Sequence, residues 1–169
     1  GAMVNMSFEV AKKAVDFLIE KSGHRRNLEV DFFGGEPLLN FDVVKKTVAY
    51  ARGLEKETGK NFRFTITTNA TLLNDDAIDF FNREMYNVVI SIDGRKDVHN
   101  SVRKTATGEG SYDLAMKNAL DFKAKRKGQY YVRGTYTALN KDFSEDVLFL
   151  NDLGFDQISI EPVVLPATH

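Results

Sequence analysis

The sequence contains no cysteine among its 169 residues. This absence excludes disulfides, and it excludes any metal centre or iron–sulfur cluster held entirely by thiolates of this chain. No segment rich in proline, glycine or serine divides the chain, and no low-complexity tract or repeat beyond a strand–helix unit is visible. The length and this uninterrupted pattern therefore predict one globular domain with a core of its own.

The sequence also lacks an excess of charge of either sign, since its formal net charge is −1 at pH 7. This balance gives no reason to expect nucleic acid or an anionic membrane as a partner. No apolar run approaches the roughly 20 residues of a membrane helix, and no signal peptide is visible, so we expect a cytoplasmic protein. Residues 1–3 (Gly-Ala-Met) read as a cloning scar, which leaves 4–169 as the expected domain.

Five segments rich in strand-forming residues alternate with segments of helical periodicity. The predicted strands are residues 28–33, 62–69, 88–93, 129–137 and 157–161. The predicted helices begin at Ser7, Asn40, Asn74, Ser111 and Ser144. Residues 94–110 are expected to form a long polar loop. This alternation predicts right-handed crossovers and a parallel sheet of the α/β class.

Successive side chains of a strand point to opposite faces of the sheet. The even-numbered face is apolar: Leu28, Val30, Phe32, Phe62, Phe64, Ile66, Val88, Ile90, Ile92, Val132, Ile158 and Ile160. The odd-numbered face is polar: Glu29, Asp31, Arg63, Thr65, Thr67, Asn69, Ser91, Asp93, Arg133, Thr135, Thr137, Ser159 and Glu161. A closed TIM barrel would fill its interior with apolar side chains. We therefore predict an open, partial TIM barrel with a polar concave face.

Such a polar face suits a polar ligand. Alternatively, its side chains satisfy one another in a structural network, for example Arg133 with Asp93. The turn Gly34-Gly35-Glu36-Pro37 follows the first predicted strand, at the end where α/β proteins bind ligands. Glycine allows positive φ and close approach to the bare backbone, and Pro37 stiffens the exit. The alternative for this turn is a tight strand-to-helix connection without a ligand.

An ordered series resembles the radical SAM superfamily: FFGGEPLLN (32–40), FRFTITTN (62–69), SIDG (91–94), His99 and Arg103 in the next loop, and ISIEPVV (158–164). Within it, the SPASM-type peptide-modifying branch is most similar, and RRNLEVDFFGGEP (25–37) with LGFDQISIEPVV (153–164) resembles the SCIFF-peptide maturases. The resemblance covers nearly the whole chain.

This resemblance implies an enzyme that cleaves S-adenosylmethionine at a four-iron four-sulfur cluster to form a thioether crosslink in a cysteine-rich precursor peptide. The cluster loop of the family, CxxxCxxC, and its first barrel strand are missing here. We therefore expect a core fragment of a longer enzyme that is inactive alone and holds no cluster through its own ligands.

The resemblance also implies ligand contacts. Gly34, Gly35 and Glu36, with Pro37 after them, would hold the methionine amine through backbone carbonyls. Asn69, Ser91 and Asp93 would contact hydroxyl and carboxylate groups, and Arg133 would clamp the methionine carboxylate. Ile160, Pro162 and Val163 would pack against adenine. No catalytic base is identified.

Two departures from the family pattern stand out. The usual TTNG reads TTN-Ala70, and alanine would cost about 1 kcal/mol or more if this turn needs positive φ. Asn100 follows His99 where aspartate is more common, and His99 itself is either functional or a packing residue.

Two other functions stay open: a sulfatase-maturing enzyme of the same branch, and a cluster-free domain that binds a nucleotide or peptide. The first predicted strand, 28–33, would lie at an unpaired sheet edge, which predicts edge-to-edge dimers.

Overall fold

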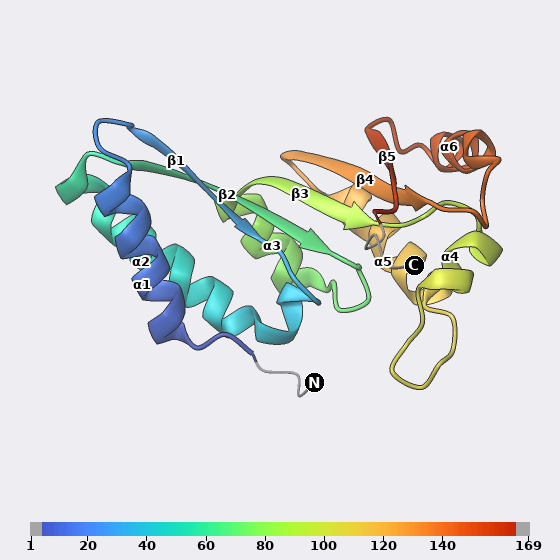
Figure 1. Cartoon of the computed structure of the whole chain (residues 1–169), viewed down its shortest axis with the longest axis horizontal. Coiled ribbons are helices and arrows are strands. Elements are labelled where there is room, and N and C mark those ends of the chain that lie inside the picture. Colours follow the sequence, from blue (N-terminus) through green and yellow to red (C-terminus); the bar gives the residue numbers. More distant parts are fainter. Residues whose placement is uncertain (1–4, 165–169) are drawn as a thin grey trace.

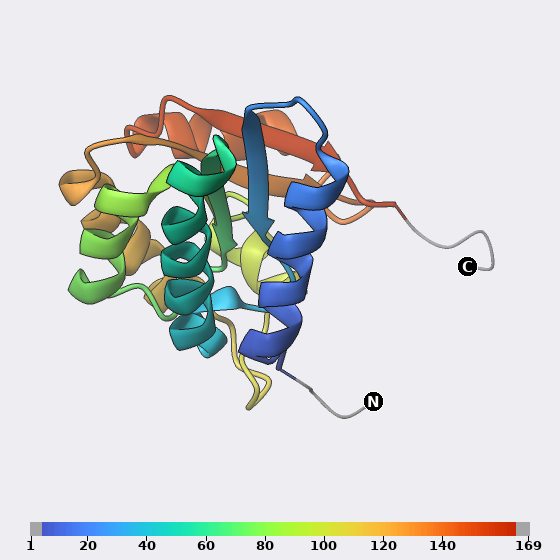
Figure 2. The same cartoon turned by 90° about the vertical axis from the view of Figure 1, so that its left-hand side faces the viewer.

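The computed structural model describes residues 5–164 and shows one curled sheet of five parallel strands in the order β1-β2-β3-β4-β5. The strands are β1 (Asn27–Phe32), β2 (Asn61–Thr68), β3 (Met85–Ser91), β4 (Gln129–Tyr136) and β5 (Ile158–Pro162). The helices are α1 (Phe8–Lys21), η1 (Pro37–Asn40), α2 (Phe41–Thr58), α3 (Asp75–Glu84), α4 (Lys96–Val102), α5 (Tyr112–Lys125) and α6 (Phe143–Asp152). The sheet and its helices form the predicted half-barrel (Figures 1 and 2).

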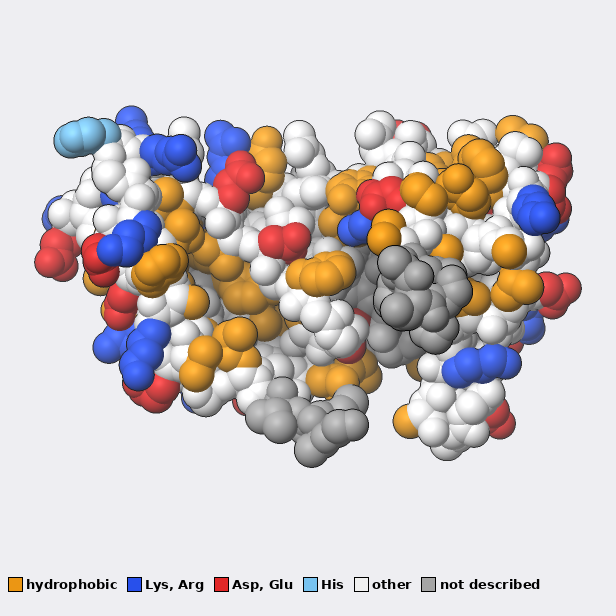
Figure 3. Space-filling model, viewed as in Figure 1, with side chains coloured by type: hydrophobic (Ala, Val, Ile, Leu, Met, Phe, Trp, Pro, Cys, Tyr) orange, Lys and Arg blue, Asp and Glu red, His pale blue; other side chains and the backbone are white. Residues whose placement is uncertain are grey.

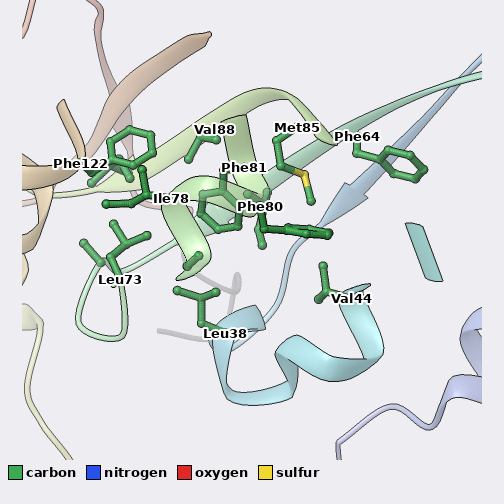
Figure 4. Packing of buried hydrophobic residues seen from close by; sticks show 14 of the residues in the cluster. Leu38, Val44, Phe64, Leu73, Ile78, Phe80, Phe81, Met85, Val88 and Phe122 are labelled. Carbon is green, nitrogen blue, oxygen red and sulfur yellow. The ribbon is translucent and has the colours of Figure 1, made fainter. Parts of the chain in front are cut away.

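The even-numbered face of the sheet carries the core, as predicted. Phe62, Phe64 and Ile66 of β2 and Ile90 of β3 are buried, and they belong to one apolar cluster with residues of the covering helices. Figure 4 shows the central part of this cluster, where Phe80 and Phe81 of α3 lie among Leu38, Val44 and Val88. Burial of these large side chains is the main favourable contribution to the fold.

The odd-numbered face is concave and mostly polar, with one apolar interruption. Val89 of β3 is 2% exposed and lies in register with Tyr131 of β4 on this face. The predicted polar face therefore holds at most positions, but an apolar step crosses its middle strands.

No helix among residues 5–164 is long and apolar enough to cross a membrane.

Two of the five predicted helix starts, Ser7 and Asn74, are confirmed by capping contacts. The Ser7 side chain accepts a hydrogen bond from the backbone N–H of Val10, and Asn74 accepts one from Ala77. Asn40 does not cap α2, because its side-chain amide donates to the Met6 carbonyl at 2.8 Å and a 3₁₀ turn precedes the helix.

Three other sequence expectations need correction. Residues 94–110 are not a continuous loop, since α4 forms within them and Lys104 bridges Gly110. Ser111 precedes α5 without capping it, because its hydroxyl donates to the Arg103 carbonyl instead. The last helix begins at Phe143, one residue before the predicted start.

Candidate functional site

The glycine turn after β1 borders open space. Gly34 has φ +147°, a conformation that other residues rarely adopt. A Cβ built on Gly34 or Gly35 would meet no protein atom within 4 Å. Their carbonyl oxygens accept no hydrogen bond within residues 5–164. Two consecutive backbone acceptors are therefore available to a ligand at this edge.

The side chain of Glu36 hydrogen-bonds to other groups of the protein. Its carboxylate accepts hydrogen bonds from the backbone N–H of Leu38 (3.0 Å), the hydroxyl of Thr68 (2.9 Å) and the backbone N–H of Asn69 (2.7 Å). Its own carbonyl accepts from the N–H of Leu39. Glu36 therefore ties the glycine turn to the end of β2, which fixes the turn in space.

The end of β2 needs positive φ, as the departure at Ala70 suggested. Ala70 has φ +65°, and no other non-glycine residue of the described chain has positive φ. Just before it, the Asn69 side-chain oxygen accepts from the N–H (3.0 Å) and hydroxyl (2.7 Å) of Thr71. The Asn69 amide nitrogen has no partner within residues 5–164, so only this end of the side chain is available to a ligand.

One row of polar side chains crosses the concave face. The strand register places Ser91 of β3 beside Arg133 of β4, and Arg133 beside Ser159 of β5. The Ser91 hydroxyl makes no hydrogen bond within residues 5–164. Extending the β2–β3 register by one residue beyond Thr68 and Ile90 brings Asn69 beside Ser91. The structure therefore aligns three predicted contact residues, and it adds Ser159, which sequence reasoning placed on the polar face without a role.

Arg133 forms an ion pair with Glu161, not with Asp93 as the alternative interpretation had it. The Nη2 group of Arg133 donates to Oε2 of Glu161, and both side chains are partly exposed. No other hydrogen bond of the Arg133 guanidinium is seen in the described chain, so most of its five N–H donors have no protein partner there. Farther along this face, burial raises the pKa of the Asp31 carboxyl, and the positive charge of Arg133 partly opposes that rise.

Asp93 is buried beneath this row, with 1% exposure. Its carboxylate accepts from Arg103 Nε at 2.5 Å and from Arg103 Nη2 at 3.0 Å, and Oδ1 also accepts from the N–H of Thr135 at 2.8 Å. A charge buried this deeply is tolerated because a bidentate guanidinium and a backbone donor compensate it. The structure therefore places Asp93 in a support under the site.

His99 of α4 completes this support. Its Nδ1 accepts from the backbone N–H of Asp93 at 3.4 Å, and its Nε2 lies 3.0 Å from the Ser111 hydroxyl. Burial lowers the pKa of His99 to about 4; Asp93 opposes this shift and Arg103 adds to it. A neutral imidazole buried between two elements is a packing and hydrogen-bonding residue, which favours the structural alternative for His99.

A second buried carboxylate clamps the turn that follows Asp93. Asp146 of α6 is fully buried and accepts from the backbone N–H of Arg95 at 3.1 Å and from its Nε at 2.7 Å. A Cβ on Gly94 would lie 2.3 Å from the Asp146 side chain, so only glycine fits between them. The segment between β3 and α5 is therefore held from both sides.

The three residues predicted to pack against adenine do not lie on the same side of the sheet. Ile160 lies on the helix-facing side of β5, where its Cδ1 would meet a Cβ on Gly134 at 2.6 Å. Pro162 shares this parity, whereas Val163 has the parity of the concave face and is 42% exposed. Val163 therefore lies on the side of the polar row, and Ile160 does not.

The available groups suit a polar organic ligand better than a metal. Among residues 5–164 no group of three or more His, Cys, Asp or Glu side chains could hold a metal ion. Backbone carbonyls, a free hydroxyl and a guanidinium match an ammonium, a hydroxyl and a carboxylate, so the donor set fits S-adenosylmethionine. The iron–sulfur cluster does not fit this chain alone, because the sequence holds no thiolate.

Sequence reasoning missed the roles of Arg103 and Glu161. The parity of β5 already put Glu161 on the concave face, and that signal could have paired it with its neighbour Arg133. Arg103 could not be paired with Asp93 in the same way, because their contact depends on the unpredicted helix α4.

Residues 1–153 match the Radical SAM superfamily, so the chain belongs to this family, whose enzymes use S-adenosylmethionine and a four-iron four-sulfur cluster. The chain is 29% identical over 123 residues to the cysteine-type anaerobic sulfatase-maturating enzyme of Clostridium novyi, covering 72% of this chain and 32% of that protein. It is 26% identical over 161 residues to the serine-type anaerobic sulfatase-maturating enzyme of Bacteroides thetaiotaomicron, covering 94% and 38%.

The solved structure of native anSMEcpe with bound AdoMet superposes with a TM-score of 0.87 at 20% identity, covering 98% of this chain and 45% of that one. This likeness confirms the partial-barrel fold. The chain spans about a third of the length of the curated relatives it matches.

Proposed function

We propose that this chain is the S-adenosylmethionine-binding core of a peptide-modifying radical SAM enzyme. The single observation that carries this proposal is that the carbonyls of Gly34 and Gly35, just after β1, accept no hydrogen bond in the described chain, while Ser91 and Arg133 stand side by side on the concave face of the same sheet. Family membership supports the ligand class, and this arrangement of residues supports the contacts proposed below.

Each group has one task in the proposed complex. The carbonyls of Gly34 and Gly35 accept from the methionine ammonium, and Arg133 donates to the methionine carboxylate. Ser91 and the Asn69 amide bind ligand oxygens. Glu36 and Asp93 do not contact the ligand in this complex. Their carboxylates hold the glycine turn and the end of β3 in place. When bound, the cofactor and the cluster supply the radical chemistry, and the protein supplies binding and orientation.

For the substrate we propose a ribosomal, cysteine-rich precursor peptide in which a thioether crosslink forms. The similarity of residues 25–37 and 153–164 to the SCIFF-peptide maturases supports this choice. The second candidate is sulfatase maturation, because two of the reported relatives carry that name. Both candidates expect a peptide on the concave face, and assays of the longer parent protein with each peptide class distinguish them.

The ligand proposal is tested on this chain by titrating S-adenosylmethionine into ¹⁵N-labelled protein. We expect saturable shifts of the amide signals at the glycine turn and at the ends of β3 and β4. Gly35→Ala should weaken binding because its methyl enters the space the ligand needs, and it touches no protein atom. Gly53→Ala is the matched control, since its methyl also meets nothing but lies on α2. Equal affinity of both variants would refute the assigned contacts.

The enzyme proposal is tested on the parent protein after anaerobic reconstitution with iron and sulfide. We expect an electron paramagnetic resonance signal of the reduced cluster that changes when S-adenosylmethionine is added. A folded parent protein that forms no cluster would refute the enzyme assignment and support the cluster-free binding domain.

A further inference from the structure

The turn after β2 presents the Asn69 amide to the ligand in the proposed complex. On the face of the molecule shown in Figure 3, charged side chains of both signs are intermixed, so no field of one sign there would orient an ionic ligand. The orientation of the ligand then depends on individual hydrogen bonds and on the groups that hold each donor and acceptor in place. For Asn69, the holding group is the peptide that joins Ala70 to Thr71.

The N–H end of this peptide faces Asn69. The backbone N–H of Thr71 donates to Oδ1 of Asn69 at 3.0 Å, and the Thr71 hydroxyl donates to the same oxygen at 2.7 Å. A backbone N–H can only donate, so the oxygen of the Asn69 amide has to face Thr71 and its NH₂ group points away from it. The Ala70–Thr71 peptide therefore decides which end of the Asn69 side chain a ligand meets.

The carbonyl end of the same peptide is held from α5. Asn118 donates through Nδ2 to the Ala70 carbonyl at 2.9 Å and to the Thr71 carbonyl at 3.3 Å. A side-chain NH₂ group has two N–H donors, so one residue can serve both carbonyls. The peptide unit is planar, and fixing the direction of its C=O therefore also fixes the direction of its N–H. Through this one peptide, Asn118 controls the orientation of Asn69.

The turn needs this contact because its own sequence disfavours its conformation. Ala70 is fully buried and has φ +65°, where alanine is strained and glycine is not. Glu36 holds the residues that precede Ala70, since its carboxylate accepts from the hydroxyl of Thr68 and the N–H of Asn69. Asn118 supplies the corresponding contact from another element on the side that follows. The strained turn is thus held from both sides.

We propose that Asn118 is a positioning residue for ligand binding, which holds the Ala70–Thr71 peptide so that the N–H donors of the Asn69 amide face the ligand. This inference rests on the proposed function, because it concerns the contact assigned to Asn69. It implies that Asn69 meets a hydrogen-bond acceptor of the ligand, such as a hydroxyl or carboxylate oxygen. Asn118 and Asn69 should therefore act as one unit in binding.

The test is a double-mutant cycle on the affinity of the whole chain for S-adenosylmethionine, measured by titrating ¹⁵N-labelled protein. Asn118→Leu nearly keeps the size of the side chain and removes its donors, so it should weaken binding about three- to tenfold, the range of one hydrogen bond. In the Asn69→Ala background the same substitution should change the affinity less than about twofold, because the group that it positions is gone. Asn151→Leu is the matched control, since Asn151 is an exposed asparagine of α6, and it should bind like the native chain.

A readout without ligand separates positioning from a general loss of stability. In ligand-free Asn118→Leu, the side-chain amide signals of Asn69 should shift or broaden, whereas in Asn151→Leu they should stay in place. Circular dichroism confirms that each variant is folded. Asn118→Ala repeats the cycle if the leucine variant does not fold.

The outcomes distinguish this inference from the proposed function. A native chain that shows no saturable binding would refute the proposed function, and the positioning role with it. If the native chain binds, the positioning role alone is overturned when the folded Asn118 variant leaves the affinity unchanged, or when it weakens binding by the same factor with and without the Asn69 side chain.

Discussion

Arg103→Met is the substitution that tests the support beneath the site most directly. Arg103 donates two hydrogen bonds to the Asp93 carboxylate, and methionine keeps much of the side-chain length while removing the charge. Asp93 would keep only the backbone N–H of Thr135 as a described partner. A carboxylate with 1% exposure would then be buried with one donor.

Removing one partner of a buried ion pair typically costs 3–5 kcal/mol, because the remaining charge is uncompensated. The Arg103 side chain is 30% exposed, so water can reach its place and the lower end of this range applies. We expect the free energy of unfolding to fall by about 3 kcal/mol. For a chain of this size, that loss lowers the melting temperature by about 6–12 °C.

Urea unfolding, followed by circular dichroism, measures this change against the native chain. The double variant Asp93→Asn/Arg103→Met removes the unpaired charge and should recover stability to within about 1–2 kcal/mol of the native chain. If Arg103→Met alone costs less than about 1 kcal/mol, the pair behaves as an exposed salt bridge, and the support assigned to Asp93 is refuted.

Three further predictions concern the glycine turn, the anchoring of that turn by Glu36, and the buried His99. Gly34→Ala should lower the free energy of unfolding by about 1–3 kcal/mol in urea because of its φ of +147°, whereas Gly35→Ala should leave it unchanged; equal effects would contradict the assigned backbone conformations. Glu36→Gln should cost about 1–3 kcal/mol, since an amide oxygen replaces a carboxylate that accepts three hydrogen bonds; a neutral result in the same assay would refute this anchoring. His99 binds its proton only near pH 4, below its ordinary value of 6.5, so the unfolded chain takes up a proton first as the pH falls. Stability should therefore be complete above about pH 6.5 and decrease toward pH 4 by up to about 3 kcal/mol, and His99→Asn should flatten this part of the urea-derived pH profile.

The strands and the two faces of the sheet were predictable because they follow from a local rule. Alternation of side chains along a strand needs no knowledge of distant residues, so Phe62, Phe64 and Ile66 identify the buried face directly. The positive φ of Ala70 was predictable only through the family resemblance, because it is the usual TTNG pattern that has glycine at this position. The apolar step at Val89 and Tyr131 breaks the pattern of the polar face.

The interior of the site was less predictable because its contacts join residues distant in sequence. Helix α4 is seven residues long and mostly polar, so it lacks the apolar periodicity that identifies a helix. Without α4, the contact of Arg103 with Asp93 could not be inferred, and the structural alternative offered Asp93 instead of Glu161 as the partner of Arg133. Side-chain pairing on a curved sheet depends on which loops cover it, and the sequence pattern does not encode that locally.

The site divides its predicted residues into two groups that experiments can separate. The carboxylates of Glu36 and Asp93 accept hydrogen bonds from donors within the protein. Substitutions that remove these carboxylates should therefore weaken ligand binding and stability together. A Cβ on Gly35 would enter open space, and the Arg133 side chain is partly exposed, so Gly35→Ala and Arg133→Gln should weaken binding while the unfolding midpoint stays near that of the native chain. Arg133→Gln breaks only a partly exposed ion pair, which is worth at most about 1 kcal/mol. If Arg133→Gln instead lost as much stability as Glu36→Gln and left binding unchanged, Arg133 would belong to the support, and the carboxylate of the ligand would need another partner.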